Sequence, residues 1–176
     1  MANGVLLVRH GEPDYDAVHP IGVGAPARNV APLTAAGRLQ AVECARRLDV
    51  PVARIVASPM TRTLQTAALM ARALSVDLEV EVDLREWDSG THGSAAAFAA
   101  AAAEYRRCSG APPPRAGAWE SASRLRSRAI EAVERWRDAD AVVVLVTHAF
   151  VMEALTGVDG RTVGFCDVLP LRGRLG

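Results

Sequence analysis

Lysine is absent from this chain, and it has few aromatic residues and no excess of charge of either sign. All 20 basic residues are arginines, 20 acidic residues balance them, and aromatic residues make up 5% of the sequence. The balance excludes a strongly basic nucleic-acid surface and a strongly acidic tail. Arginine suits the recognition of phosphate or carboxylate through its planar fork of N–H donors. A GC-rich genome is the alternative explanation for the missing lysine, and it also accounts for the abundance of Ala, Val and Gly.

Paired cysteines and long apolar runs are also missing. Cys44, Cys108 and Cys166 are odd in number and far apart, and no Cys-x-x-Cys or Cys/His metal spacing occurs. The pattern indicates neither a disulfide framework nor a metal site, and it favours a reducing, cytoplasmic setting. Because no run of about eighteen strongly apolar residues and no basic segment before an apolar run is found, we expect neither a membrane span nor a secretory signal.

The apolar pattern predicts one α/β domain over residues 1–176, since half of the residues are apolar and the length suits a single core. Continuous apolar runs predict buried strands at Val5–Val8, Arg54–Ala57 and Ala141–Val146, with Leu78–Val82 as a further candidate. Helical patterns occupy Thr34–Leu48, Met60–Leu74, Glu120–Arg137 and a segment that begins at Ala149. The alternation predicts a three-layer αβα sandwich with a mainly parallel central sheet.

Two segments interrupt this alternation. Asp14–Pro32 is rich in Pro, Gly and Asn, which predicts a long loop. Ser94–Arg107 is rich in alanine and therefore favours a helix, which the prolines at 112–114 would end. Alanine is too weakly hydrophobic for this run to be a membrane helix. We therefore predict a small helical lid insertion at about 94–117.

Two histidines follow predicted strands directly. His10 stands in Arg9-His10-Gly11 after the first strand, and His148 follows the Ala141–Val146 strand through Thr147. The carboxyl ends of parallel strands are where open α/β sheets bind ligands, and Gly11 permits a sharp bend and close approach. One histidine could attack a substrate while the other donates hydrogen bonds to the developing charge. A structural histidine at a strand end remains the alternative for each position taken alone.

Arg62 and Glu86 are further candidate residues of the predicted site. Arg62 lies in the first predicted turn of the Met60–Leu74 helix, where free N–H groups and the helix dipole favour an anion. A solvated helix arginine is the alternative. Glu86, in Leu84-Arg85-Glu86-Trp87, is a candidate general acid because a nearby aromatic ring raises the pKa of a carboxyl group. Asp88 competes with Glu86 for this role, and a solvated carboxylate is the alternative for either residue.

These segments, in their order along the chain, resemble the motifs of the histidine phosphatase superfamily, also called the phosphoglycerate-mutase-like family. Val8-Arg9-His10-Gly11-Glu12 resembles its nucleophile motif, and Leu33–Ala41 resembles its first helix. Ser58–Ala67 is similar to the second-arginine motif, Leu84-Arg85-Glu86 to the acid segment and Val146-Thr147-His148 to the second-histidine motif. Glu120-Ser121, with Arg128 beyond, is similar to a Gly-Glu-Ser segment. The resemblance spans most of the chain, from Leu6 to about Gly157.

The resemblance implies a covalent mechanism. His10 would take the phosphoryl group, while Arg9, Arg62 and His148 would surround its oxygens. Glu86 would protonate the leaving alcohol and then activate water. Two guanidiniums and an imidazolium would supply the positive charge, so the resemblance implies no metal and no other cofactor.

Three departures from the family pattern affect the substrate more than the reaction. Asp16 stands where the family often has asparagine, and its carboxylate would repel phosphate unless it turns away or meets a cationic part of the substrate. The segment after the acid is reduced to Gly90-Thr91-His92-Gly93, which keeps Asp88 open as the acid. Ala149 replaces the glycine that usually follows the second histidine.

The sequence thus predicts a metal-independent phosphomonoesterase that hydrolyses a small phosphorylated metabolite through a phosphohistidine on His10. We expect a small-molecule phosphate ester as partner, with no nucleic acid and no membrane, and an exposed sheet edge is compatible with a homodimer. A phosphoglycerate-type mutase is the first alternative, although such enzymes carry longer chains and larger lids. A catalytically silent phosphate-binding regulatory module is the second, and the retention of both histidines, both arginines and a candidate acid argues against it.

Overall fold

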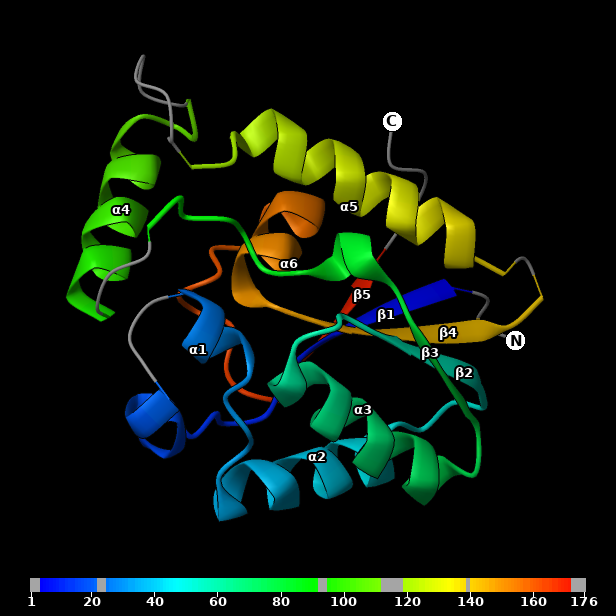
Figure 1. Cartoon of the computed structure of the whole chain (residues 1–176). Helices are drawn as coiled ribbons and strands as arrows, with labels where there is room; N and C mark the ends of the chain where they lie inside the picture. Colours follow the sequence, from blue (N-terminus) through cyan, green and yellow to red (C-terminus); the bar gives the residue numbers. More distant parts are fainter. Residues whose placement is uncertain (1–3, 22–24, 92–94, 112–118, 139, 172–176) are drawn as a thin grey trace.

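A mainly parallel sheet forms the centre of the protein (Figure 1). The structure is a computed structural model that describes residues 4–21, 25–91, 95–111, 119–138 and 140–171. In this part of the chain five strands lie in the order β3-β2-β4-β1-β5. They are β1 (Gly4–Arg9), β2 (Val52–Ala57), β3 (Asp77–Val80), β4 (Val142–Thr147) and β5 (Val168–Leu171). The first four are parallel, and β5 pairs antiparallel with β1, which confirms the predicted fold class.

Helices cover both faces of this sheet, as the layers in Figure 1 show. On one face α2 (Ala35–Arg47) packs against α3 (Thr61–Leu74), and on the other α5 (Ala122–Trp136) packs against α6 (Ala149–Thr156). The side chain of Thr34 accepts a hydrogen bond from the Gly37 N–H, and that of Ser121 accepts one from the Arg124 N–H. These N-caps satisfy donors that the first helical turn leaves free. The predicted Thr34–Leu48 and Glu120–Arg137 helices are confirmed to within about two residues.

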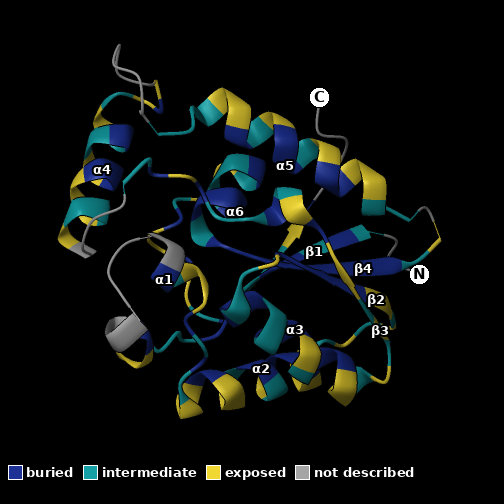
Figure 2. Ribbon diagram, viewed as in Figure 1, coloured by how far each residue is buried: buried dark blue, intermediate teal, exposed yellow. Residues whose placement is uncertain are grey.

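Strand β4 divides the apolar core into two clusters. All six of its residues are buried, as the dark blue centre of Figure 2 shows. Val143 and Leu145 join the cluster under α5 and α6, whereas Val144 and Val146 join the cluster over α2 and α3. Successive side chains of a strand point to opposite faces, so a continuous apolar run serves a sheet that is covered on both sides.

Three sequence predictions need correction. Strand β5 was not predicted from the sequence, and its Pro170 is tolerated because the strand lies at the edge of the sheet. The predicted loop 14–32 contains a 3₁₀ helix, η1 (Asp16–Ile21), and a short helix, α1 (Ala25–Asn29). The predicted strand Leu78–Val82 is β3 as far as Val80, after which a 3₁₀ turn, η2 (Val82–Leu84), leads into the Glu86 segment.

Helix α4 (Ala95–Arg107) confirms most of the helix predicted at Ser94–Arg107. It buries Ala101, Ala102 and Tyr105 against the cluster that also contains Trp87 and Phe150. Ser94 and residues 112–117 of the predicted lid insertion lie outside the described residues, so a closing role for this insertion stays a prediction. In the described part of the chain no helix is long and apolar enough to cross a membrane.

Candidate active site

Strands β1 and β4 bring the two histidines together. Arg9 and Thr147 are paired in the last register position of these strands, and the His10 N–H donates to the Thr147 carbonyl at 3.0 Å. Each histidine follows its strand directly, so the imidazole rings meet edge to face with centroids 5.2 Å apart. The predicted placement of His10 and His148 at one sheet edge is therefore confirmed.

His10 is held as a neutral imidazole with one defined tautomer. Its Nδ1 lies 2.8 Å from the Gly11 carbonyl, and the Arg62 Nε–H donates to its Nε2 at 3.2 Å. A guanidinium can only donate, so Nε2 carries the lone pair and the proton is on Nδ1. Burial and the charge of Arg62 hold the pKa of His10 well below its usual value. The nitrogen that faces Arg62 is thus unprotonated and nucleophilic.

His148 is also neutral in the unliganded site. Arg62 Nη2 lies 3.2 Å from its Nδ1, and Ser58 Oγ lies 2.8 Å from its Nε2. The arginine must donate, so His148 donates from Nε2 to Ser58. Burial, followed by the charge of Arg62, holds the pKa of His148 well below its usual value. The imidazolium that the family resemblance implies is therefore not the form this site favours without an anion.

Arg62 links the two histidines from the first turn of α3. Its side chain is buried, and Nη1 donates to the Arg28 carbonyl at 3.0 Å. Thr66, one turn later, donates to the Arg62 carbonyl and accepts from the Gly11 N–H, which ties α3 to the nucleophile loop. Burial lowers the pKa of Arg62, yet among the described residues no carboxylate pairs with it. A buried charge without a counter-ion is poised to bind an anion.

Arg9 contributes a second cation from the end of β1. Its guanidinium carbon lies 4.5 Å from the centre of the Phe165 ring, and Nη1 donates to the Val163 carbonyl. Within the described residues its buried Nε has no hydrogen-bond partner. Burial lowers the pKa of Arg9, and the carboxyl of Glu86 opposes this effect. The Nε–H of Arg9 is thus a donor that the described fold leaves unused.

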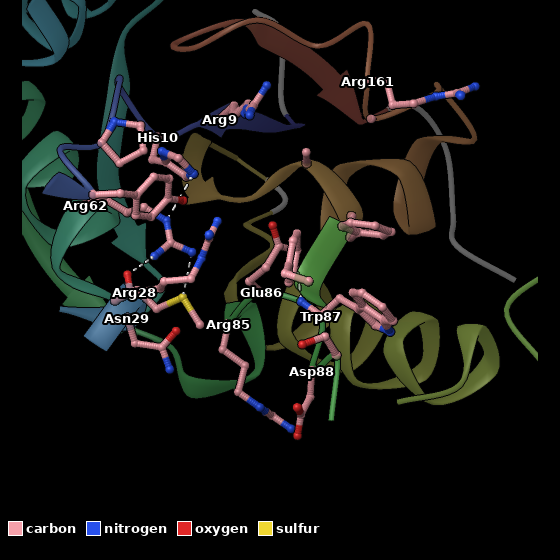
Figure 3. Close-up of a pocket in the computed structure, with 18 of the residues that line it drawn as sticks. Arg9, His10, Arg28, Asn29, Arg62, Arg85, Glu86, Trp87, Asp88 and Arg161 are labelled. Carbon is pink, nitrogen blue, oxygen red and sulfur yellow. Dashed lines mark hydrogen bonds between the residues drawn. The ribbon is translucent and has the colours of Figure 1, made fainter. Parts of the chain in front are cut away.

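Glu86 and Asp88 lie differently on the cavity wall. Glu86 points toward the side that holds His10 and Arg62, whereas the Asp88 side chain extends away (Figure 3). Burial raises the pKa of Glu86, although a hydrogen bond from the Trp87 N–H and the charges of Arg62 and Arg9 oppose that rise. Asp88 is exposed and accepts from the Gly90 N–H at 2.9 Å.

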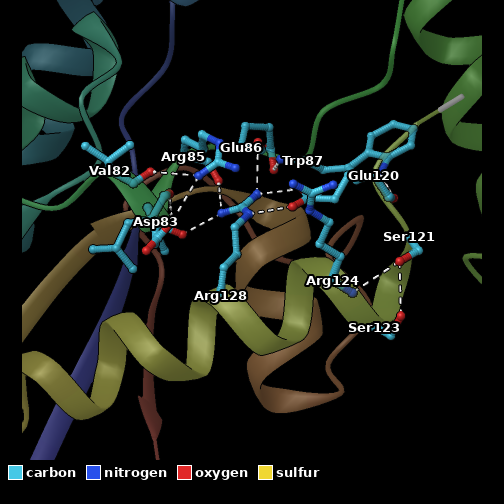
Figure 4. Close-up of polar contacts among 12 residues, drawn as sticks. Val82, Asp83, Arg85, Glu86, Trp87, Glu120, Ser121, Ser123, Arg124 and Arg128 are labelled. Carbon is cyan, nitrogen blue, oxygen red and sulfur yellow. Dashed lines mark hydrogen bonds and ion pairs between the residues drawn. The ribbon is translucent and has the colours of Figure 1, made fainter. Parts of the chain in front are cut away.

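Arg128 holds the segment that presents Glu86 (Figure 4). From α5 it donates to both carboxylate oxygens of Glu120, at 2.7 and 2.8 Å. It also donates to the carbonyls of Asp83, Arg85 and Glu86. Arg128, in a buried ion pair with Glu120, thus satisfies three of the four carbonyls from Asp83 to Glu86, and the Thr147 hydroxyl donates to the fourth, that of Leu84. The Glu120 and Arg128 that the family resemblance singled out are partners.

Two glycines let the nucleophile loop contact α2. A Cβ at Gly11 would lie 2.5 Å from the Gly37 carbonyl oxygen, and a Cβ at Gly37 would lie 2.3 Å from the Glu12 carbonyl oxygen. Both distances are too short for any other residue. Glu12 completes this junction, because its N–H donates to Gln40 and its carboxylate accepts from the Thr34 hydroxyl.

Four of the six candidate residues line one cavity of about 620 Å³ (Figure 3). Arg9, His10, Arg62 and Glu86 line it, and His148 lies behind Arg62. Asp16, which the sequence analysis placed at the substrate, is exposed in η1 and does not line the cavity. Among the described residues no group of three or more His, Cys, Asp or Glu could hold a metal ion.

Two residues of this site were not predicted from the sequence. Ser58 was quoted only as part of a motif, and the structure makes it the hydrogen-bond partner of His148. Arg28 lines the cavity from α1, inside the segment that was predicted to be a loop. No local signal marks Arg28, because its position depends on contacts with Tyr15 and Phe98, and Phe98 is distant in sequence.

Comparison with known proteins shows the family and the fold. The model of the histidine phosphatase superfamily (branch 1) matches residues 5–159. The mycobacterial glucosyl-3-phosphoglycerate phosphatase solved with VO3 has a TM-score of 0.70 at 23% identity, over 98% of this chain and 92% of that chain, which shows a shared fold. Bacillus stearothermophilus YhfR has a TM-score of 0.70 at 26% identity, over 89% of this chain and 79% of that chain.

A curated relative from Enterobacter sp. (strain 638), a probable phosphoglycerate mutase GpmB, is 39% identical over 87 residues. That alignment covers 49% of this chain and 39% of the relative. The chain thus aligns with less than half of that protein, whereas the family model covers most of this chain. The chain belongs to the histidine phosphatase superfamily (branch 1).

Proposed function

We propose that this protein is a metal-independent phosphomonoesterase that hydrolyses a small phosphorylated metabolite through a phosphohistidine on His10. The observation that carries the proposal is the unprotonated Nε2 of His10, which faces the Nε–H of Arg62 inside the cavity. A phosphate ester placed there would meet a nucleophile and a cation without a counter-ion. Such an arrangement suits covalent phosphoryl transfer.

In the first step Nε2 of His10 attacks phosphorus, and the bond from phosphorus to the alcohol oxygen breaks. Arg9 and Arg62 bind the phosphoryl oxygens, and an arriving dianion favours the protonated form of His148, which then donates to it. The Gly11 carbonyl keeps the proton of His10 on Nδ1 throughout. Glu86 gives its proton to the departing alcohol oxygen.

In the second step the deprotonated Glu86 takes a proton from water, which attacks phosphorus and breaks the P–N bond. Phosphate leaves, and His10 regains its lone pair while Glu86 regains its proton. The raised pKa of Glu86 supports this assignment, because a carboxyl whose pKa is raised by burial keeps its proton to higher pH and is better suited to act as an acid. The direction of its side chain toward His10 supports it as well.

The test is a phosphate-release assay on a panel of phosphorylated metabolites, followed by acid or base quenching during turnover. We expect phosphate on the enzyme in a base-stable, acid-labile linkage, and we expect His10→Ala to lose both the linkage and turnover with an unchanged circular dichroism spectrum. An acid-stable linkage would contradict His10 as the nucleophile. Movement of phosphate within a substrate without its release to water would identify a mutase.

Metal independence has its own measurement. Activity should survive exhaustive dialysis against EDTA, and vanadate or tungstate should inhibit because each occupies the phosphoryl position among the same cations. Activity that disappears with chelation and returns with magnesium or zinc would contradict the proposal.

A further inference from the structure

Six arginines of the described part of the chain line the cavity: Arg9, Arg28, Arg62, Arg85, Arg106 and Arg161. They divide into two groups by whether they have an ion-pair partner. Three of them form ion pairs, Arg85 with Asp83, Arg106 with Glu153 and Arg161 with Asp159. The other three, Arg9, Arg28 and Arg62, have no carboxylate partner within the described residues. The proposed mechanism uses Arg9 and Arg62, and it leaves Arg28 without a role.

Aromatic rings hold Arg28 in place instead of a counter-ion. Its guanidinium carbon lies 4.2 Å from the centre of the Tyr15 ring and 5.1 Å from that of Phe98. Stacking on ring faces leaves the N–H donors at the edge of the guanidinium free. Figure 3 shows the Arg28 side chain extending into the cavity on the side of Arg62. Those donors can therefore reach a ligand.

Arg28 also adds to an excess of positive charge at this end of the cavity. Its backbone carbonyl accepts from Arg62, and its charge is close enough to contribute to the lowered pKa of Arg62. Two carboxyl groups lie on the cavity wall among the residues that the structure describes; Glu86 has a raised pKa and Asp88 points away. A phosphoryl dianion balances two guanidiniums and leaves the third for another anionic group.

We propose that Arg28 determines substrate specificity by binding a second anionic group, carried by the alcohol part of the phosphate ester. The preferred substrates are then phosphate esters of acidic alcohols rather than of neutral ones. A cavity of about 620 Å³ has room for such an alcohol beside the phosphoryl group. This inference rests on the proposed function, because it takes Arg9 and Arg62 as the phosphoryl site.

Binding of unreactive ligands tests Arg28 separately from catalysis. The ligands are two matched series of alkylphosphonates, from three to six carbons, that end in a carboxylate or in a hydroxymethyl group. Calorimetry should show that the wild-type protein binds the best carboxylate about 10- to 100-fold more tightly than its hydroxyl match, the range of a charge-assisted hydrogen bond. Alkylene bisphosphonates form a third series, which distinguishes a site for carboxylate from one for a second phosphate.

Two substitutions at Arg28 and one elsewhere complete the experiment. Arg28→Gln should remove the preference for the acidic ligand, and Arg28→Lys should keep part of it, because lysine retains the charge without the fork. Arg161→Gln is the matched control, since Arg161 lines the same cavity but pairs with Asp159. It should keep the full preference.

Equal affinity for the acidic and neutral ligands at every length, or a preference that survives Arg28→Gln, would overturn the inference. If Arg28→Gln does not fold, a preference in Arg28→Lys that equals the wild-type value would overturn it as well. Wild-type protein that shows the preference but releases no phosphate from any ester would refute the proposed function and leave the role of Arg28 standing.

Discussion

Arg62 and Arg128 are equally hidden from solvent, at 4% and 7% exposure, but their surroundings differ. Arg128 faces the carboxylate of Glu120 and three backbone carbonyls, so its charge is balanced and its donors are used within the fold. Arg62 donates to two neutral histidines and a carbonyl, and no described carboxylate balances it. Arg128 stabilises the structure, whereas the charge of Arg62 stays free to bind an anion. Burial alone does not distinguish the two roles, but the counter-ion does.

The largest expected effect of this difference is on catalysis. Arg62→Gln should lower kcat/KM for any phosphate ester by about three to five orders of magnitude, as the loss of a transition-state arginine does in phosphoryl transfer. The midpoint of thermal unfolding should stay unchanged or rise, because the substitution removes a buried charge without a partner. Steady-state kinetics and a thermal melt on the same sample measure both. A large loss of stability would place Arg62 in the same class as Arg128.

The next largest effect is expected at Glu86, the proposed general acid, whose segment Arg128 holds in place. Glu86→Gln should slow the hydrolysis of alkyl phosphates by about two to four orders of magnitude, the range of a general acid. It should slow p-nitrophenyl phosphate much less, because nitrophenolate leaves without a proton. Asp88→Asn is the matched control. If only the Asp88 variant shows this dependence on the leaving group, Asp88 is the acid.

Arg128 itself should affect stability first. Arg128→Met leaves the buried Glu120 carboxylate unpaired, so the free energy of unfolding should fall by about 3–5 kcal/mol. Chemical denaturation measures this change. Replacement of both partners, Arg128→Met with Glu120→Leu, should recover most of the loss because no buried charge is then left alone. A double variant as unstable as the single one would mean that the hydrogen bonds to the carbonyls, rather than the charge balance, stabilise the segment.

The smallest expected effect is on titration. The charge of Arg62 contributes, after burial, to the lowered pKa of His10. In Arg62→Gln this pKa should therefore move up toward its usual value of about 6.5. A lowered pKa keeps His10 neutral at pH values where a free imidazole is charged, so the acid limb of wild-type kcat/KM should lie below about pH 6.5. NMR titration of the imidazole resonances measures the shift, and an unchanged value would show that the charge of Arg62 does not lower the pKa of His10.

The sequence predicted those parts of the fold that depend on local pattern. The apolar runs and caps placed β1, β2, β4 and the four layer helices, because burial on both sides of a sheet leaves a continuous apolar signature. Strand β5 was missed because Pro170 argues against a strand unless its position at the edge of the sheet is known. Helix α1 was missed because the composition of its segment favours a loop, whereas tertiary contacts determine the structure that it adopts.

The same division applies to the site. His10, His148, Arg62 and Glu86 follow recognisable elements, and the structure brings them to one cavity with His148 behind Arg62. The tautomers of the two histidines depend on Gly11, Ser58 and Arg62 together, which no single segment reveals. The selection of Arg28 over the other cavity arginines depends on which acidic residues lie nearby in space.

The contact between Gly11 and Gly37 has a consequence for helix α2. Glycine is a poorer helix former than alanine, so helix propensity by itself would favour alanine at position 37, in the first turn of α2. A methyl group there would collide with the Glu12 backbone and push the loop that carries His10. The residue at position 37 of this helix is therefore constrained by the position of His10, which lies on the loop that contacts it. A change chosen to strengthen α2 would displace the nucleophile.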